Sequence, residues 1–235
     1  MRSVVVVAVP TDESIHVAVV ALVASELVQD VVTQLEREAL RIEVGGAELM
    51  NAAPTAGVYV VTVDAALGPL VGERVVAWAH RGELHPGVIG LVVDGGGRER
   101  ESLLAAGFDD VVVAPLSVRE LVARVRAVHR RVSWRGASHG RLRYGGYTLD
   151  VHGHALWADG KVIALTSLEL AVLRELMKAR GRSRSRVELL AAAWGDGELD
   201  VSERSVDNVI LRLRRKLPRP ELIETVRSVG FRLAP

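Results

Sequence analysis

The residues best suited to recognise another molecule lie on one side of a single stretch, SERSVDNVILRLRRKL, between Ser202 and Leu217. Apolar residues recur there at i, i+4, i+7 and i+11, which at 3.6 residues per turn forms one buried stripe along a helix. These are Val206, Ile210, Leu213 and Leu217. The opposite side carries Arg204, Ser205, Asn208, Arg212, Arg215 and Lys216. Arginine and asparagine read base edges in the major groove of DNA, whereas lysine and serine reach phosphates. The stretch therefore predicts a DNA-recognition helix, with a solvated basic helix face as the alternative.

Composition restricts the class of protein. The 235 residues are enough for two ordinary domains. Lys and Arg number 13 against 17 Asp and Glu in residues 1–135, but 17 against 12 in residues 136–235. This asymmetry indicates that the second half meets nucleic acid. The absence of cysteine excludes disulfides and thiolate metal sites. No apolar stretch is long enough to span a bilayer, so we expect a cytoplasmic protein without a membrane partner.

The first half alternates valine-rich apolar runs with helical patterns. The runs are Val4–Val9, His16–Val23, Val58–Val63, Val88–Val93 and Val111–Ala114. Continuous apolar runs, rather than alternating ones, are typical of strands buried on both faces of a parallel sheet. The helical patterns are Glu26–Leu40, Gly72–Ala79, Glu99–Ala106 and Val118–Arg131. The first half is therefore predicted to be a doubly wound α/β domain.

The pattern changes after the Ser- and Gly-rich stretch SWRGASHG, which predicts a linker near residues 132–140. Short strands separated by Gly-Gly, His-Gly and Asp-Gly turns follow. The spacing of Thr166 and Glu169 then fits a capping box at the start of a helix. A second helix at Arg186–Trp194, the recognition helix and the hairpin LIETV-RSVG-FRL complete the chain. Three helices with a terminal hairpin predict a winged helix-turn-helix whose wing carries Arg227.

These C-terminal segments resemble the DNA-binding domain of OmpR/PhoB-class response regulators. LTSLELAVLRELM, SRVELLAAAWG, ERSVDNVILRLRRKL and LIETVRSVGFRL occur in the order and at the spacing of that family. The resemblance implies that the helix lies in the major groove and the wing in the minor groove. It implies that Trp194 lies near a phosphate, with core packing as an equal alternative, and that DNA is contacted by Arg204, Ser205, Arg212, Arg214 and Arg227. Val209 and Leu211 replace residues that are often histidine and arginine, so we expect fewer polar base contacts and thymine-methyl contacts in exchange.

The first half resembles the flavodoxin-like receiver domain of the same family. LEREALRIEV, VVTVDAALGPLVGERVV and AAGFDDVVVAPLSVRELVARVRAVHRR are the matching segments. Asp64, eight residues before Gly72, holds the position of the phosphorylatable aspartate. Counting back from Asp64 places the first strand at His16–Val20, although a register that starts at Val4 is also open. The predicted domains are residues 1–15 (an extension or extra strand), 16–131 (receiver-like), 132–140 (linker) and 141–235 (winged helix).

The residues that receivers use for phosphoryl transfer are largely replaced. Phosphorylation of aspartate needs a divalent cation held by carboxylates. The positions of the acidic pair hold Ala21 and Leu22, or Ala8 and Val9 in the other register. Val92 replaces the hydroxyl residue and Ala114 replaces the lysine. We therefore interpret the receiver as degenerate and Asp64 as an acceptor position that is not used. We expect no metal, no cofactor and no enzymatic activity.

The resemblance also implies a homodimer through the fourth helix, fifth strand and fifth helix of the receiver, here residues 99–106, 111–114 and 118–131. The predicted interface residues are Asp109, Asp110, Leu116, Glu120, Leu121 and Arg124. Surface ion pairs contribute little, so the apolar residues must supply most of the affinity. The alternative is a solvated helix face.

Together these features predict a sequence-specific transcriptional regulator of the two-component type that binds double-stranded DNA as a dimer, independently of phosphorylation. By the same resemblance, the loop Gly195–Val201 touches RNA polymerase. Two alternatives remain. In the first, the degenerate receiver senses a small ligand. In the second, the protein is a conventional regulator phosphorylated at Asp64.

Overall fold

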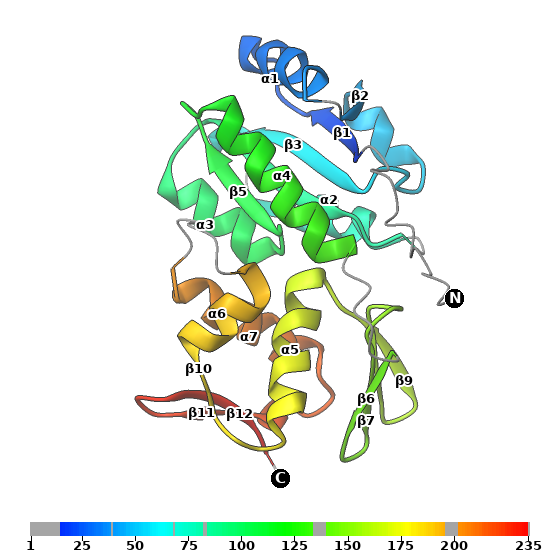
Figure 1. Ribbon diagram of the computed structural model, residues 1–235, viewed down its shortest axis with the longest axis vertical. Coiled ribbons are helices and arrows are strands. Elements are labelled where there is room, and N and C mark those ends of the chain that lie inside the picture. The colour runs from blue at the N-terminus through cyan, green and yellow to red at the C-terminus, as the bar shows by residue number, and fades with distance from the viewer. Residues whose placement is uncertain are drawn as a thin grey trace, which may run out of the picture.

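A computed structural model describes residues 15–38, 40–67, 69–81, 84–133, 140–195 and 202–234. The predicted strand at Val4–Val9 lies outside these residues, as does the loop after Gly195. The chain forms a first domain (residues 15–133) and a second domain (residues 140–234), one above the other in Figure 1. Within the described residues, no helix is long and apolar enough to cross a membrane.

The first domain is built on a parallel sheet in the order β2-β1-β3-β4-β5. Its strands are β1 (His16–Ala21), β2 (Arg41–Gly45), β3 (Val58–Asp64), β4 (Gly87–Asp94) and β5 (Asp110–Val113). Alternate residues of β1 enter different cores, with Val17 and Val19 on one face of the sheet and Ala18 and Val20 on the other. Burial on both faces explains why the valine runs are continuous rather than alternating.

Helices cover both faces of this sheet. α1 (Glu26–Glu36) and α4 (Val118–Ser133) share one core with it, while α2 (Pro69–Ala79) and α3 (Gly97–Ala106) share the other. The predicted doubly wound domain is confirmed. Where a further helix could cross between β2 and β3, the chain forms the short 3₁₀ segment η1 (Ala47–Asn51), and a second, η2 (Ala65–Leu67), follows β3.

Four predicted helix boundaries differ from the structure. α3 begins two residues early, at Gly97, and α4 ends two residues late, at Ser133, while the larger differences are at α1 and α2. The helix predicted to run to Leu40 ends at Glu36, where the N–H of Arg37 donates to the carbonyls of Gln34 and Leu35 and caps it. The chain then enters β2, because the Arg41 N–H must bond to the Ile15 carbonyl at 3.0 Å to start the β1–β2 pairing. The helix predicted to start at Gly72 begins three residues earlier, at Pro69.

The second domain opens with an antiparallel sheet in the order β6-β7-β8-β9. Its strands are β6 (Arg141–Tyr144), β7 (Tyr147–Asp150), β8 (Ala155–Ala158) and β9 (Lys161–Ala164). Three helices follow, α5 (Ser167–Ala179), α6 (Arg186–Trp194) and α7 (Arg204–Lys216). They share one core with the inward side chains of the two sheets of this domain.

The wing is a three-stranded antiparallel sheet, β10-β12-β11. It consists of β10 (Arg184–Ser185), β11 (Ile223–Val226), preceded by the 3₁₀ turn η3 (Pro220–Leu222), and β12 (Gly230–Leu233). Gly230 is required where β12 meets β10, because its φ is 155° and a Cβ would collide with the carbonyl of Arg184. The predicted winged helix-turn-helix is therefore confirmed.

Candidate DNA-binding surface and receiver site

The apolar side of α7 fixes the helix in the second domain. Val206, Val209, Ile210 and Leu213 are at most 1% exposed and lie in the domain core. Val209 therefore packs inward, and the expectation that it contacts a thymine methyl is wrong. Leu211 is 47% exposed and keeps that possibility open. The burial of this stripe turns the remaining side of α7 away from the core.

The polar side of α7 is only partly open. Arg204 and Arg215 are exposed and Asn208 is half-buried. Arg227 is exposed in the turn between β11 and β12, at the tip of the wing. Ser205, in contrast, is 6% exposed. The predicted contacts with DNA stay predictions. Arg215 and Arg227 have exposed side chains, whereas Arg204, although exposed, lines the space between α7 and α3.

Arg214 holds the wing against α7. Its Nη2 donates to the Ile223 carbonyl at 2.6 Å and to Thr225 Oγ1 at 2.9 Å, and its Nε donates to the same carbonyl at 3.1 Å. Arg186 makes a matching link from α6, donating to Asp207 at 3.0 and 2.9 Å while its guanidinium lies 4.7 Å from the Phe231 ring centroid. Both arginines therefore set the angle between helix and wing.

Arg212 points away from any open surface and joins the two domains. Its Nη1 donates to the carbonyls of Leu104 at 2.6 Å and Ala105 at 3.0 Å, near the C-terminal end of α3. Its Nε donates to Glu169 Oε1 at 3.3 Å. A cation is stabilised at the C-terminus of a helix, where carbonyls are left without partners. In this conformation Arg212 is thus an interdomain residue rather than a base-reading one.

Glu169 is the centre of this network, and sequence reasoning recognised it only as a cap. It is fully buried and accepts hydrogen bonds from Thr166 N at 2.9 Å and Lys216 Nζ at 2.7 Å as well as from Arg212. Burial lowers the pKa of Arg212, and the charge of Glu169 opposes that change. The capping box was readable from the sequence, but the three-dimensional meeting of α5 and α7 was not.

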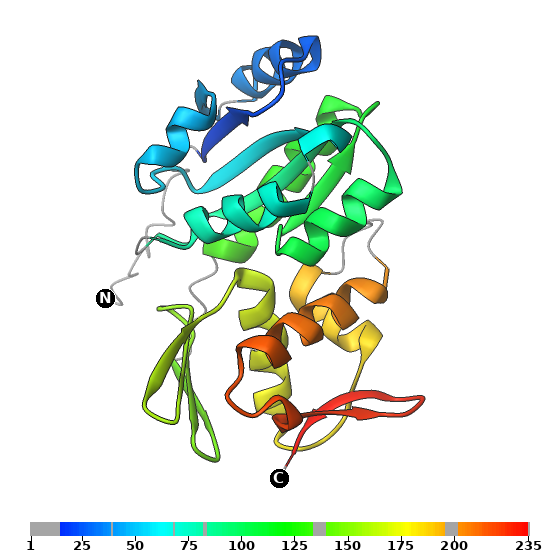
Figure 2. The same ribbon diagram turned by 180° about the vertical axis from the view of Figure 1, so that it is seen from behind.

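The N-terminal half of α7 also faces α3 (Figure 2). A groove of about 360 Å³ separates the two helices, and Arg204, Asn208 and Glu101 are among the residues that line it. The major groove of B-DNA is about 12 Å wide and must enclose the reading helix closely. A duplex cannot take that position while α3 lies beside α7.

A second link joins α4 to α6. Arg131 donates to the Trp194 carbonyl at 3.2 Å and to the Asp109 carbonyl at 3.2 Å. The Asp109 carboxylate is buried and accepts from Val88 N at 2.8 Å. Burial raises the pKa of Asp109, and the charge of Arg131 opposes the rise. Trp194 is 5% exposed, as its core-packing alternative predicted, which leaves the phosphate contact untested.

Two histidines complete the contact between domains. The rings of His85, before β4, and His154, in the turn between β7 and β8, stack at a centroid distance of 4.6 Å and an angle of 14°. Burial and the neighbouring His85 lower the pKa of His154 to about 4. Neither histidine was recognised from the sequence, because nothing in their local patterns indicates that they meet.

Asp64 ends β3, as the receiver resemblance implies. Its Oδ1 accepts from the N–H groups of Ala66 and Leu67, both at 3.0 Å, so the carboxylate caps η2. A cavity of about 380 Å³ beside it is lined by Val63, Asp64, Ala65, Leu67, Val71, Arg98, Glu99, Ser102 and Leu103. Among the described residues, no group of three histidine, aspartate or glutamate side chains could hold a metal ion.

Most of the residues predicted for the dimer interface are internal. Asp109, Asp110, Leu121 and Arg124 are at most 7% exposed within the single chain. Arg124 donates to Asp110 at 3.0 Å and to Glu120 at 2.7 Å, so its charge is paired within its own domain. The expectation that these charges lie exposed around Leu121, available to a second protomer, is therefore wrong. Leu116 and Glu120 do retain exposed surface.

These features define a two-domain protein with a receiver-type sheet and a winged helix. Residues 160–233 match the family described as "Transcriptional regulatory protein, C terminal". The phosphate regulon transcriptional regulatory protein PhoB of Pseudomonas aeruginosa is 32% identical over 221 residues, which cover 88% of this chain and 96% of PhoB. The transcriptional regulatory protein CutR of Streptomyces coelicolor is 33% identical over 209 residues, covering 88% and 95%.

A solved structure of a RitR mutant shares the fold, with a TM-score of 0.73 at 22% identity, covering 94% of this chain and 99% of that one. The chain therefore belongs to the OmpR/PhoB family of DNA-binding transcriptional response regulators. This confirms the family prediction, and the relatives are transcriptional regulators rather than enzymes.

Proposed function

We propose that this regulator binds its operator as a homodimer and that its activity does not depend on phosphorylation of Asp64. The observation that carries the proposal is the environment of Asp64. Its carboxylate is used to cap η2, and β1 ends beside it in Ala21 rather than in an acid. A phosphoryl group in transfer needs its negative charge stabilised, and although Arg98 lines the cavity beside Asp64, Ala21, Val92 and Ala114 stand where receivers have an acid, a hydroxyl and a lysine.

The divalent cation of phosphoryl transfer does not fit the described residues here. Glu99 is the other acid that lines the Asp64 cavity, but its carboxylate accepts from Gly96 N at 2.7 Å and caps α3. Val92 is fully buried where a hydroxyl would contact the phosphoryl group, and Ala114 carries no charge. Asp12 and Glu13 lie outside the described residues.

DNA binding, on this proposal, requires α7 to leave α3. Arg212 donates to two α3 carbonyls, and Arg204 and Asn208 face α3 across the groove. The arrangement in which α7 packs against α3, called docked below, is then a DNA-free state. Any condition that weakens this packing raises operator affinity. A dimer would double the number of DNA contacts, and the second protomer would bind at a high effective concentration once the first is bound. The loop after Gly195 remains the proposed contact with RNA polymerase.

Two measurements test this function. Intact-protein mass spectrometry after incubation with acetyl phosphate and Mg²⁺ is expected to show no phosphoryl adduct. An adduct that disappears in Asp64→Asn would contradict the proposal. Sedimentation of the protein with an operator selected from random duplexes is expected to give two protomers per duplex, and a single protomer at saturation would exclude the dimer.

The alternative of a ligand-sensing receiver is favoured by one observation, the cavity of about 380 Å³ beside Asp64, whose wall combines apolar residues with Arg98 and Ser102. A thermal shift that depends on a metabolite and is abolished by Ser102→Leu, which fills this cavity, would support that alternative.

A further inference from the structure

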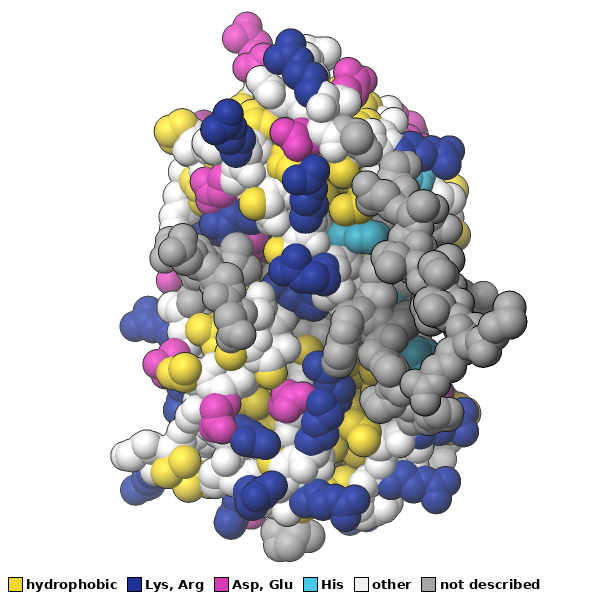
Figure 3. All heavy atoms as spheres, viewed as in Figure 1, with side chains coloured by type: hydrophobic (Ala, Val, Ile, Leu, Met, Phe, Trp, Pro, Cys, Tyr) yellow, Lys and Arg dark blue, Asp and Glu magenta, His cyan; other side chains and the backbone are white. Residues whose placement is uncertain are grey.

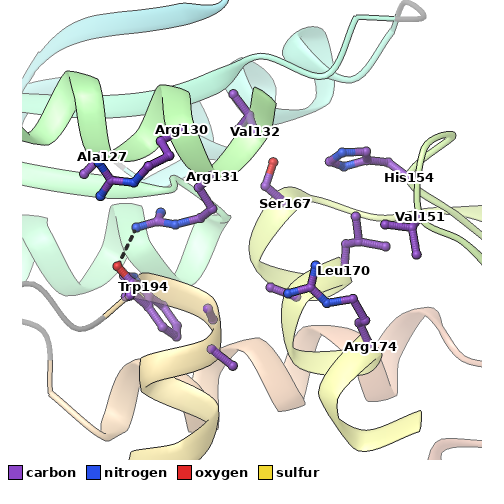
Figure 4. Close-up of a pocket in the computed structure, with 14 residues that line it drawn as sticks. Ala127, Arg130, Arg131, Val132, Val151, His154, Ser167, Leu170, Arg174 and Trp194 are labelled. Atoms are coloured by element: carbon purple, nitrogen blue, oxygen red, sulfur yellow. Dashed lines mark hydrogen bonds between the residues drawn. The ribbon is translucent and has the colours of Figure 1, made fainter. Parts of the chain in front are cut away.

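A larger cavity lies between the two domains, away from both Asp64 and the polar side of α7. It measures about 530 Å³, within the range of small-molecule sites. Figure 3 shows Lys and Arg side chains above and below a hollow at this level of the molecule. The walls come from α4 of the receiver domain and from α5, α6 and the β7–β8 turn of the DNA-binding domain (Figure 4).

The electrostatic character of this cavity is one-sided. Among the residues that the structure describes, the 14 that line it include Arg130, Arg131 and Arg174 but no aspartate or glutamate. Arg131 donates to the Asp109 carbonyl, and the charges of Asp109 and Asp110 act on its guanidinium. Burial lowers the pKa of the Arg131 guanidinium, with Asp109 opposing the change. Arg174 is ion-paired with Glu175 at 3.5 Å, so Arg130 and Arg131 are the cations that would attract an anion into this space.

The cavity wall also contains polar groups whose hydrogen-bonding capacity is unused. Ser167 Oγ, His154 Nδ1 and Trp194 Nε1 are buried and have no hydrogen-bond partner among the residues that the structure describes. In Figure 4 the Ser167 hydroxyl points toward the space between Arg131 and His154. An unpaired buried polar group costs free energy, and the Ser167 hydroxyl, which points into this space, is the group that a ligand there would pair with.

The rest of the wall is apolar. Val132, Val151 and Leu170 line the cavity together with Ala127, Ala171, Ala192 and Ala193. A fully hydrated inorganic anion would leave this apolar surface unused, whereas an organic anion would cover it. We propose that this interdomain cavity binds a small organic anion, with its carboxylate, phosphate or sulfonate group between Arg130, Arg131 and Ser167 and its apolar body against Val132 and Leu170.

Such a ligand touches both domains and therefore binds the docked arrangement only. It shifts the population toward docking by the factor 1 + [L]/Kd. On the function proposed above, ten times Kd of ligand weakens operator binding about elevenfold. The binding itself does not rest on that function, so the two statements can fail separately.

The binding test uses 8-anilinonaphthalene-1-sulfonate as the probe and neutral N-phenyl-1-naphthylamine as its uncharged counterpart, with the full chain throughout. We expect one sulfonate bound per chain and about tenfold weaker binding in Arg130→Gln, because a hydrogen bond to a charged group is lost. Arg130 is exposed, so this variant is expected to fold. Arg119→Gln, an exposed arginine elsewhere on α4, is the control and should bind as the wild type does.

A second variant tests the apolar part of the cavity. Ala127→Leu adds volume to the wall and should weaken both probes, whereas Arg130→Gln should weaken only the sulfonate. Equal sulfonate affinity in Arg130→Gln and Arg119→Gln, or unchanged affinity of both probes in Ala127→Leu, would overturn the site. Normal binding of the sulfonate without loss of operator affinity would retain the site and refute only its coupling to DNA.

Discussion

The two ends of the receiver domain differ in what their polar groups do. At Asp64 the carboxylate caps its own turn and the neighbouring positions hold Ala21, Val92 and Ala114. At the opposite boundary, where α3 and α4 meet the second domain, two sets of hydrogen bonds cross between the domains, one made by Arg212 with Glu169 and α3 and the other by Arg131 with the Trp194 carbonyl. A receiver that lacks phosphoryl chemistry can still regulate if its contact with the DNA-binding domain has two states.

The two domains also differ in which of the features expected of the family they keep. The second domain keeps the winged-helix architecture and a basic helix, which is what DNA binding requires. The first domain keeps the sheet and its helices but not the acidic pair, because the fold depends on valine packing rather than on those carboxylates. The fold therefore does not require those carboxylates.

The largest effect is expected at the interdomain network. Glu169→Ala should lower the free energy of unfolding of the DNA-binding domain by about 3–5 kcal/mol, because Arg212 then loses its buried partner. Glu188→Ala is the matched control, since Glu188 holds the same capping-box position of α6 but is exposed. Its loss should be clearly smaller than that of Glu169→Ala, because removing an exposed capping carboxylate leaves no buried charge without a partner. Chemical denaturation measures both, and equal losses would mean that the network adds no stability.

The next effect concerns the open side of α7. Arg215→Ala should weaken binding to the selected operator by about 1–3 kcal/mol if Arg215 reads a base. Arg227→Ala should weaken binding to all sequences. It should also reduce the magnitude of the slope of log K against log salt concentration by about 1, the value for one phosphate contact. Fluorescence anisotropy at several salt concentrations distinguishes the two, with Arg119→Ala as the control. Unchanged affinity in both variants would place the DNA contact elsewhere.

A smaller effect is expected from pH. The pKa of His154 falls from the ordinary 6.5 to about 4 in the docked state, since burial and the facing His85 and His80 disfavour its cation. The undocked histidine takes up a proton below 6.5 and the docked one does not. Docking is therefore fully present above about pH 7 and weakens between 6.5 and 4, roughly thirtyfold by pH 5.

Energy transfer between dyes on Glu73→Cys and Lys161→Cys can follow docking, because the chain has no cysteine of its own. His154→Asn should remove the pH dependence, and asparagine tolerates the φ of 45° at that position. His152→Asn, at an exposed histidine of the same turn, should keep it. A docked fraction that is constant from pH 7 to 5 would contradict this role of His154.

The sequence was sufficient for the two domains and for the stripe on α7, because repeated apolar spacing records burial directly. It placed Asp64 at the end of β3 through a local match. It could not show that Arg212 binds α3 or that Asp109 and Arg124 are buried, since these depend on residues far apart in the chain. Asp110 and Arg124, which the sequence suggested were exposed, form a buried ion pair with each other.

The smallest effect is expected at Asp64, and it tests the central claim most directly. Operator affinity of the wild type and of Asp64→Asn should be measured at one fixed salt concentration, with and without acetyl phosphate and Mg²⁺. Equal affinities in all four samples are predicted, because Asn can still cap η2 and no phosphoryl switch operates. Tighter binding by the wild type alone, after treatment with the phosphodonor, would contradict the account and restore phosphorylation as the switch.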